Sequence, residues 1–241
     1  MNRSFRGDTL QVAISNPIHA PLRITAQSEN SVLNEVINTT FPITLPPLLD
    51  TVFIVTSPVF RTDSSVRFGA TIGDPTASIQ PQAILFPFPK GKSYSIMQPY
   101  NGRLSHQTDY SRYALDFDLA VGDTISAADD GYVVGVVQAY KNGGKDKKWR
   151  DYANFITLFH PHSGLYTQYV HLIYNGSFVD VGDTVTAGQP IGISGETGFT
   201  TKPHLHFNVL KPTESGMKST PTRFKNGKPG LSLKRGDVVR R

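Results

Sequence analysis

Two histidines separated by a single residue lie near the end of the chain, in Pro203-His204-Leu205-His206-Phe207-Asn208-Val209. The apolar neighbours predict a strand, and side chains two residues apart on a strand project from the same face. We therefore expect His204 and His206 to lie side by side. Such a pair can bind a metal ion together, or one imidazole can bind while the other handles a proton. Surface or packing histidines show the same spacing, so the pair needs partners from elsewhere in the chain.

Three further residues are candidate partners. His171 ends a predicted strand, His106 lies in a polar stretch, and Asp116 stands between apolar residues in Tyr113-Ala114-Leu115-Asp116-Phe117. A carboxylate inside an apolar strand needs a partner, because burying an unpaired charge is very costly.

The partner of Asp116 has two interpretations. One is a salt bridge to a cation such as Arg112, and the other is a bound metal ion. Asp109 and Asp118 are rival carboxylates for the ligand role, and Asp118 has the same strand parity as Asp116.

An internal repeat indicates how the second part of the chain folds. Val121-Gly122-Asp123-Thr124-Ile125-Ser126-Ala127 recurs at 181–187, with five of seven positions identical. Gly-Asp turns that lead into short strands favour a compact antiparallel β domain with two related halves. Segments 154–160 and 165–171 predict a strand pair whose turn carries His160 and His162 at the surface. The polar, Lys-rich segment 140–151 predicts a long, exposed hairpin loop.

The first part of the chain predicts a separate unit. Short apolar segments, separated by polar or Pro-containing turns, indicate a small β-sandwich; they span 10–14, 22–26, 51–55 and 66–70. Prolines around residues 80–92 indicate a domain junction. We expect an all-β protein with an accessory β-sandwich at 1–80 and a second domain at 81–241.

Composition narrows the possible classes. Hydrophobic residues make up 38% and charged residues 18% of the 241 residues, which excludes a disordered chain. Cysteine is absent, so a metal site must use histidines and carboxylates. No apolar run approaches the length of a membrane span, and residues 1–15 lack the apolar region of a signal peptide. An exported form would therefore be a mature or trimmed chain.

The net charge of +5 is concentrated at the end of the chain. Residues 211–241 hold nine Lys or Arg and two acids, which predicts a basic tail. Such a tail can bind a polyanion or can simply be solvated. No aromatic–basic repeat or nucleic-acid signature accompanies it, so we expect no nucleic-acid partner.

Several motifs occur together in the order typical of one family. "LFPFPKGKSYSIMQPYNGRLSH", "YALDF" and "AADDGYV", followed by "YVHL", "VGDTVTAGQPIGISGETG" and "KPHLHFNV", resemble the lysostaphin-type (LytM-domain) zinc metallopeptidases. The resemblance covers residues 86–236 and leaves the predicted sandwich out. It implies a lysostaphin-like antiparallel β fold and hydrolysis of the peptide cross-links of bacterial peptidoglycan, in the periplasm or outside the cell.

The resemblance also implies residue roles. His106, Asp116 and His206 match the family's zinc ligands, and His171 and His204 match its two non-ligand catalytic histidines. One departure is that nine residues separate His106 from Asp116, whereas the family's short form has three. The residue at the short-form position is a tyrosine, which cannot replace a carboxylate, and longer spacings exist in the family.

The chemistry agrees with these roles. Two histidines and a carboxylate form a catalytic zinc site with an open position for water, and further imidazoles can act as general base and stabilise an oxyanion. Gly195 lies in a small-residue turn that could let a substrate backbone pass close by. Asn154 and Tyr169 are candidate groove residues, with core packing as the alternative for both.

Two other functions remain open at this point. A catalytically inactive LytM-like module could bind the cell wall or activate an amidase, although such relatives lose metal ligands and all five candidates are present here. A carrier or sugar-phosphotransfer β domain would need a modified Lys or His and no metal. No Lys sits at a symmetric hairpin tip of the repeats, which disfavours the carrier.

Overall fold

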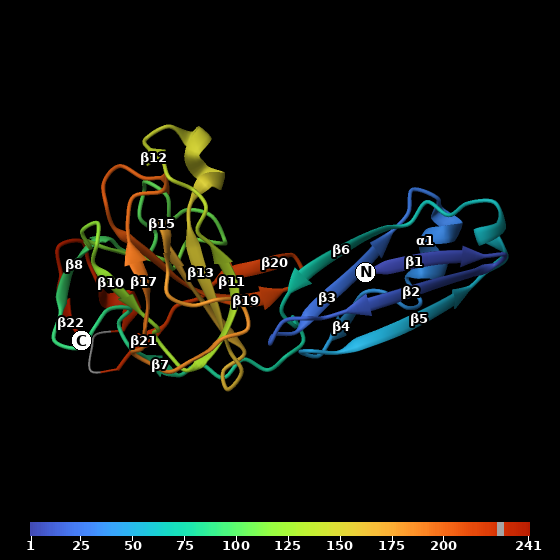
Figure 1. Ribbon diagram of the computed structural model, residues 1–241, viewed down its shortest axis with the longest axis horizontal. Helices are drawn as coiled ribbons and strands as arrows, with labels where there is room; N and C mark the ends of the chain where they lie inside the picture. The colour runs from blue at the N-terminus through green and yellow to red at the C-terminus, as the bar shows by residue number, and fades with distance from the viewer. Residues whose placement is uncertain (226–228) are drawn as a thin grey trace. The chain divides into compact units, whose positions relative to one another are not determined.

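Strands provide most of the regular structure, as the sequence predicted (Figure 1). The computed structural model describes residues 1–225 and 229–241. The described residues fall into two units, Met1–Thr76 and Ala77–Arg241. None of the helices in these residues is long and apolar enough to cross a membrane.

The first unit contains two three-stranded antiparallel sheets that share one apolar core. One sheet has the order β1-β2-β5 and the other β4-β3-β6. Their bounds are β1 Asn2–Arg6, β2 Thr9–Ser15, β3 Leu22–Gln27, β4 Ile43–Leu45, β5 Asp50–Thr56 and β6 Arg67–Ile72. The four predicted segments form β2, β3, β5 and β6. A short helix, α1 (Ser31–Ile37), was not predicted; Asn30 caps it, and Leu33 and Ile37 face the core one turn apart.

A nine-stranded sheet is the largest sheet in the described part of the second unit. Its order is β16-β11-β13-β14-β19-β9-β8-β22, with β20 beside β19. The bounds are β8 Ser93–Gln98, β9 Leu115–Phe117, β11 Gly131–Val137, β13 Phe155–His160, β14 Leu165–Val170, β16 Thr184–Val185, β19 Leu205–Thr213, β20 Gly216–Ser219 and β22 Val238–Arg240. The predicted strand pair is β13 and β14, which are antiparallel neighbours.

Smaller pairings complete the second unit. A three-stranded sheet has the order β10-β17-β15, and two parallel pairs join β12 to β18 and β7 to β21. The bounds are β7 Ala83–Ile84, β10 Thr124–Ser126, β12 Gly143–Gly144, β15 Leu172–Ser177, β17 Pro190–Ser194, β18 Gly198–Phe199 and β21 Arg223–Phe224.

The repeated Val-Gly-Asp-Thr turns have the same structure in both copies. Gly122 and Gly182 have φ angles of 97° and 103°, which only glycine adopts readily. Asp123 and Asp183 each accept a hydrogen bond at 2.8 Å from the backbone N–H three residues earlier. The two turns feed β10 and β16, so these acidic residues shape the backbone.

The predicted junction belongs largely to the second unit. Phe86 and Phe88 are buried in its core, and the ring of Phe86 stacks on that of Phe224 at 4.2 Å between centroids. The proline-rich segment therefore contributes core side chains in addition to connecting the units.

The end of the predicted basic tail is folded onto the second unit. Strand β22 pairs antiparallel with β8, and the Arg241 guanidinium donates to the Phe88 carbonyl at 2.7 Å. Lys228, one of the nine basic residues, lies outside the described residues.

Candidate functional site

Strand register brings three polar side chains to one point of the large sheet. Strand β9 lies between β8 and β19, and Asp116 is paired with His206 on β19 and with Gln98 on β8. Cross-strand neighbours have Cβ atoms about 5 Å apart. The sheet alone therefore places a carboxylate, an imidazole and an amide side by side, although 107 residues separate Gln98 from His206.

His106 reaches the same point from the loop that follows β8. Its side chain is fully buried, and its Nδ1 donates to the Pro99 carbonyl at 3.0 Å. That hydrogen bond turns Nε2 toward Asp116 Oδ1, which lies 3.1 Å away. A hydrogen bond from the far nitrogen of the ring to a carbonyl fixes the tautomer that a metal ligand needs.

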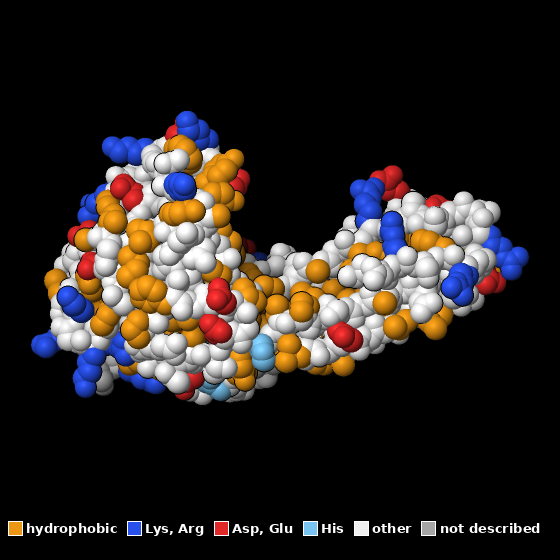
Figure 2. Space-filling model, in the orientation of Figure 1, with side chains coloured by type: hydrophobic (Ala, Val, Ile, Leu, Met, Phe, Trp, Pro, Cys, Tyr) orange, Lys and Arg blue, Asp and Glu red, His pale blue; other side chains and the backbone are white. Residues whose placement is uncertain are grey.

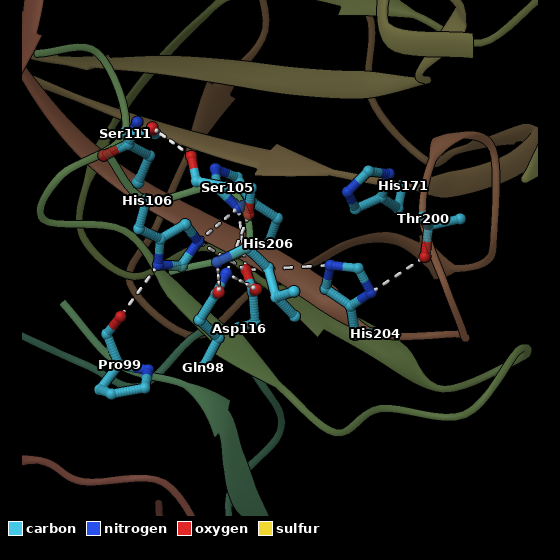
Figure 3. A network of polar contacts seen from close by, with 12 residues as sticks. Gln98, Pro99, Ser105, His106, Ser111, Asp116, His171, Thr200, His204 and His206 are labelled. Carbon is cyan, nitrogen blue, oxygen red and sulfur yellow. Dashed lines mark hydrogen bonds and ion pairs between the residues drawn. The ribbon is translucent and has the colours of Figure 1, made fainter. Parts of the chain in front are cut away.

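Three donor atoms converge in this cluster (Figure 3). His206 Nδ1 lies 2.9 Å from Asp116 Oδ1 and 3.3 Å from His106 Nε2, and the three residues offer ligand atoms within 4.8 Å of one another. Lone pairs this close need a proton or a cation between them. Two nitrogens and one carboxylate oxygen are a donor set that suits zinc, so these residues fit the metal that the sequence predicted.

The pKa values show how strongly the three groups interact. Burial acts to raise the pKa of Asp116, yet the hydrogen bonds from His106 and His206 hold it well below its usual range. Burial acts to lower the pKa of His106, but the Asp116 carboxylate outweighs it and raises that pKa. The pKa of His206 is lowered by burial. The carboxylate is thus ionised at neutral pH, as metal binding requires.

Gln98 is a functional candidate that the sequence analysis missed. Its Nε2 donates to Asp116 Oδ2 at 2.8 Å and to Ser105 Oγ at 2.9 Å, and its Oε1 accepts from the Leu104 N–H. The amide hydrogen-bonds to Oδ2 of Asp116, so Oδ1 is the oxygen that faces the two histidines. A Cβ at Gly102 would overlap the Gln98 side chain, so that glycine keeps the space for it.

We expect a Gln98→Ala variant to bind zinc about 10- to 100-fold more weakly, because outer contacts of this kind orient the ligand. Competition with a chelator of known affinity measures the change. Gln107→Ala is the matched control, since Gln107 is exposed and bonds only the Arg103 carbonyl among the described contacts. Equal zinc affinity of the Gln98→Ala and wild-type proteins would contradict the role.

His171 and His204 lie beside the cluster, with ring centroids 4.6 Å apart. His171 Nδ1 donates to the Thr197 carbonyl at 2.6 Å, and His204 Nδ1 donates to the Lys202 carbonyl at 2.8 Å. Each ring therefore keeps Nε2 for a reacting group, and His204 Nε2 lies 3.8 Å from Asp116 Oδ1. Burial, reinforced by the neighbouring imidazoles, lowers the pKa of His171 to about 3.

The backbone of His171 is strained. Its φ of 72° is in the left-handed region, which costs of the order of 1 kcal/mol for a residue with a Cβ. The strand predicted around His204 and His206 begins at Leu205, so His204 is the last residue before β19 and His206 lies within it. Both histidines face the groove described below.

The rival carboxylates have other partners. Asp109 forms ion pairs with Arg112 at 3.4 Å and with Lys218 at 2.9 Å. Asp118 pairs with Lys202 at 2.6 Å. Asp116 contacts histidines and an amide, so the interpretation as an Arg112 salt bridge is wrong.

A groove of about 630 Å³ opens beside the cluster. Asp116, His171, His204 and His206 lie on its surface, whereas His106 is behind them. Its other lining residues are Met97, Gln98, Leu104, Ser105, Thr108, Tyr110, Ser111, Arg150, Asp151, Ala153, Phe155, Gln168, Val170, Phe199, Thr200 and Thr201. An extended peptide could pass the histidines in such a groove.

The three predicted substrate contacts lie elsewhere. Tyr169 and Asn154 have no exposed surface, and neither they nor Gly195 line the groove. The Tyr169 hydroxyl accepts from the Ala128 N–H at 2.8 Å inside the core. A Cβ at Gly195 would meet Ile173 N at 2.5 Å, so this glycine allows close packing of two backbone segments. Direct substrate contact by these residues does not fit this structure.

Asn154 instead positions the segment that carries His171. Its Nδ2 donates to the carbonyls of Tyr140, Leu172 and Ile173 at 2.8–3.3 Å, and its backbone carbonyl accepts from the His171 N–H. The side chain thus holds the strained turn in place.

An Asn154→Ala variant is expected to lose about 3 kcal/mol of stability in the second unit, because three buried or partly buried carbonyls lose a donor. Urea unfolding monitored by the fluorescence of Trp149 measures this loss. Asn142→Ala, in the exposed segment nearby, should change the midpoint little. A loss below about 0.5 kcal/mol for Asn154→Ala would show that water replaces the amide.

His160 and His162 were predicted at the surface, which is wrong for His160. It is 1% exposed, and its two nitrogens contact the Asp130 carbonyl and Thr167 Oγ1, both at 2.8 Å. Burial lowers its pKa. His162 is partly exposed and pairs with Asp129 at 2.8 Å. These residues form no part of the cluster.

One family model matches part of this chain. Residues 110–221 match the sequence model described as Peptidase family M23. This stretch contains Asp116, His171, His204 and His206, and His106 lies shortly before it.

Two relatives whose names state an activity match part of the chain. The chain is 40% identical over 104 residues to the glycyl-glycine endopeptidase ALE-1 of Staphylococcus capitis, covering 42% of this chain and 25% of that protein. It is 32% identical over 95 residues to the peptidoglycan DD-endopeptidase ShyA of Vibrio cholerae, covering 39% and 19%. The match thus spans a quarter or less of either relative's length.

A solved structure is also similar. The catalytic domain of lysostaphin from Staphylococcus simulans is 30% identical, with a TM-score of 0.38, and the match covers 53% of this chain and 87% of that domain.

Proposed function

We propose that this chain, whose residues 110–221 match the model of peptidase family M23, is a zinc-dependent endopeptidase that hydrolyses the peptide cross-links of bacterial peptidoglycan. One observation carries the proposal: the ligand atoms of His106, Asp116 and His206 lie within 4.8 Å of one another, beside two further imidazoles on a groove.

The proposed ligands are His106 Nε2, His206 Nδ1 and Asp116 Oδ1. Zinc held by three protein ligands lowers the pKa of a bound water to about 7 and polarises a peptide carbonyl. The protein's own contribution is to orient these ligands. Gln98 and the Pro99 carbonyl do this through their hydrogen bonds to Asp116 and His106.

His171 and His204 are suited to the proton transfers. Each is held as the tautomer with Nδ1 protonated, so Nε2 can accept the proton that water loses when it attacks the peptide carbonyl. The same Nε2 can then give that proton to the leaving amine, or donate a hydrogen bond to the oxyanion. Their burial excludes competing water from the rings.

The relatives support peptidoglycan as the substrate class. The names of two relatives specify a glycyl-glycine endopeptidase and a peptidoglycan DD-endopeptidase. Since peptidoglycan lies outside the cytoplasmic membrane, the proposed site of action is the periplasm or the cell exterior.

Zinc analysis and digestion of sacculi test the proposal together. Purified protein is expected to contain about one zinc per chain by mass spectrometry, and to release cross-link-derived muropeptides from sacculi. A chelator should stop the release, and added zinc should restore it. Intact sacculi of both glycine-bridged and directly linked types, with zinc bound, would refute the proposed activity.

A further inference from the structure

The Lys-rich segment 140–151 lies in the connection between the antiparallel neighbours β11 and β13, and most of its residues are exposed, as the predicted hairpin loop requires. It also forms a wall of the groove, which was not predicted. Its strand β12 pairs in parallel with β18, and its second half is the 3-10 helix η2 (Lys147–Tyr152), capped by Asp146. The Gly198 N–H donates to the Asn142 carbonyl at 3.2 Å, and the Thr200 N–H to the Gly144 carbonyl at 3.1 Å.

Glycines allow this close docking. A Cβ at Gly143 would overlap the Glu196 carbonyl, and a Cβ at Gly198 would meet Ala153 Cβ at 2.5 Å. Residues 196–200, against which this segment docks, include Thr197, whose carbonyl orients His171. We call residues 140–152 the wall segment.

Cationic side chains are concentrated on the wall segment. It contains Lys141, Lys145, Lys147, Lys148 and Arg150 against Asp146 and Asp151. Figure 2 shows Lys and Arg side chains gathered at the end of the second unit where Figure 1 places β12. Lys148 pairs with Asp146 at 3.6 Å, and Lys141 lies over the Tyr174 ring.

Arg150 is the cation that faces the groove. Among residues 1–225 and 229–241 it is the single Lys or Arg that lines this groove. The side chain is exposed, and within the same described residues its guanidinium has no hydrogen-bond or ion-pair partner. A guanidinium presents its donors in a planar fork that matches a carboxylate.

The groove contains two acidic residues, and only one of them is free of contacts with the histidine cluster. Asp116 is engaged by His106, His206 and Gln98, so it does not neutralise Arg150. Asp151 follows Arg150 and also lines the groove; its carboxylate is suited to accept a peptide N–H. Arg150 therefore remains the group that can take an anionic part of a substrate.

Apolar residues form much of the remaining groove surface. Leu104, Phe155, Val170 and Phe199 lie along it, and side chains with methyl groups gain from contact with them. An all-glycine bridge has neither side chains nor a charge, so it would use neither these residues nor Arg150. A direct link from alanine to diaminopimelate offers a methyl group and a free carboxylate next to the scissile amide.

We propose that Arg150 forms a carboxylate subsite, and that the protein therefore cleaves directly linked, carboxylate-bearing cross-links in preference to all-glycine bridges. This inference rests on the proposed endopeptidase function. It assigns a specificity to the wall segment and leaves the metal cluster unchanged.

Three synthetic cross-linked peptides test the subsite with the full chain. The first contains an alanyl–diaminopimelate link with a free carboxylate, the second has that carboxylate amidated, and the third has a pentaglycine bridge. We expect kcat/KM for the acid to exceed that for the amide by about tenfold, because hydrogen bonds to charged groups are strong. The ratio should fall toward one in 1 M salt.

Variants of the wall segment separate the subsite from a general charge effect. Arg150→Ala should reduce the acid-to-amide ratio to about one, and Arg150→Lys should retain part of it, because lysine keeps the charge without the fork. Lys147→Ala is the matched control, since it removes an exposed charge of the same 3-10 helix that does not line the groove. Its ratio should equal that of the wild type.

Binding provides a second readout that does not depend on turnover. On a His204→Ala background, the labelled acid peptide should bind about tenfold more tightly than the amide, and Arg150→Ala should abolish the difference. Equal ratios for wild type and Arg150→Ala, or faster cleavage of pentaglycine, would overturn the subsite alone. Failure of the wild type to cleave any of the three peptides would overturn the endopeptidase function, and the subsite with it.

Discussion

An Asp116→Asn protein is expected to purify with little zinc and to digest sacculi at least about 10³-fold more slowly than the wild type. The substitution keeps the volume of the side chain and removes its charge, which is the only carboxylate in the cluster of ligand atoms that the described residues form. Loss of outer contacts alone weakens metal sites 10- to 100-fold, so loss of a ligand should cost more.

Zinc per chain, measured by mass spectrometry, and the initial rate of muropeptide release test this prediction. His162→Ala is the control, because His162 belongs to the same unit and pairs with Asp129 away from the cluster. A thermal unfolding curve for each protein checks that the fold is retained. An Asp116→Asn protein with one zinc per chain and the wild-type rate would remove Asp116 from the ligand set.

Replacing His204 or His171 by alanine should have a different signature: zinc stays bound, and the rate falls by about 10² to 10⁴. Neither imidazole belongs to the three-residue cluster, but both line the groove and keep Nε2 for a proton. Zinc content, kcat and KM are measured on the same preparations. The effect should lie mainly in kcat, since the lost interaction is made in the transition state.

The double variant sharpens this second prediction. If the two histidines act on one proton transfer, losing both should slow the reaction little more than losing the more important one. Loss of zinc from either single variant would show that the ring is a ligand, and an unchanged rate would show that it is a spectator.

The sequence predicted the parts of the fold that have a clear period. Alternating apolar residues located β2, β3, β5 and β6, and the repeated glycine turns located β10 and β16. Helix α1 was missed because two buried positions, Leu33 and Ile37, are too few to establish a helical period. The wall segment was predicted as an exposed hairpin loop, but its docking to residues 196–200 was missed, because local sequence does not show a contact with a distant part of the chain.

The order of the motifs identified the five candidate residues, and the structure brings their side chains together. They are His106, Asp116, His171, His204 and His206. Gln98 left a weaker signal: it has the same parity as Ile96 on β8, and both are buried. A polar residue on the inward face of a strand needs a partner, and that argument could have connected it to Asp116. For Asn154 and Tyr169 the choice between groove and core stayed open, because a strand's sequence does not distinguish its two buried faces.

Three of the four imidazoles at the site are aligned by main-chain carbonyls, those of Pro99, Thr197 and Lys202. Every residue type carries a carbonyl, so no substitution at these three positions deletes the acceptor. Substitutions in the surrounding sequence therefore leave the contacts that orient the rings in place. Homologous chains can exchange the side chains around the groove, and with them their substrates, while the imidazoles keep their alignment.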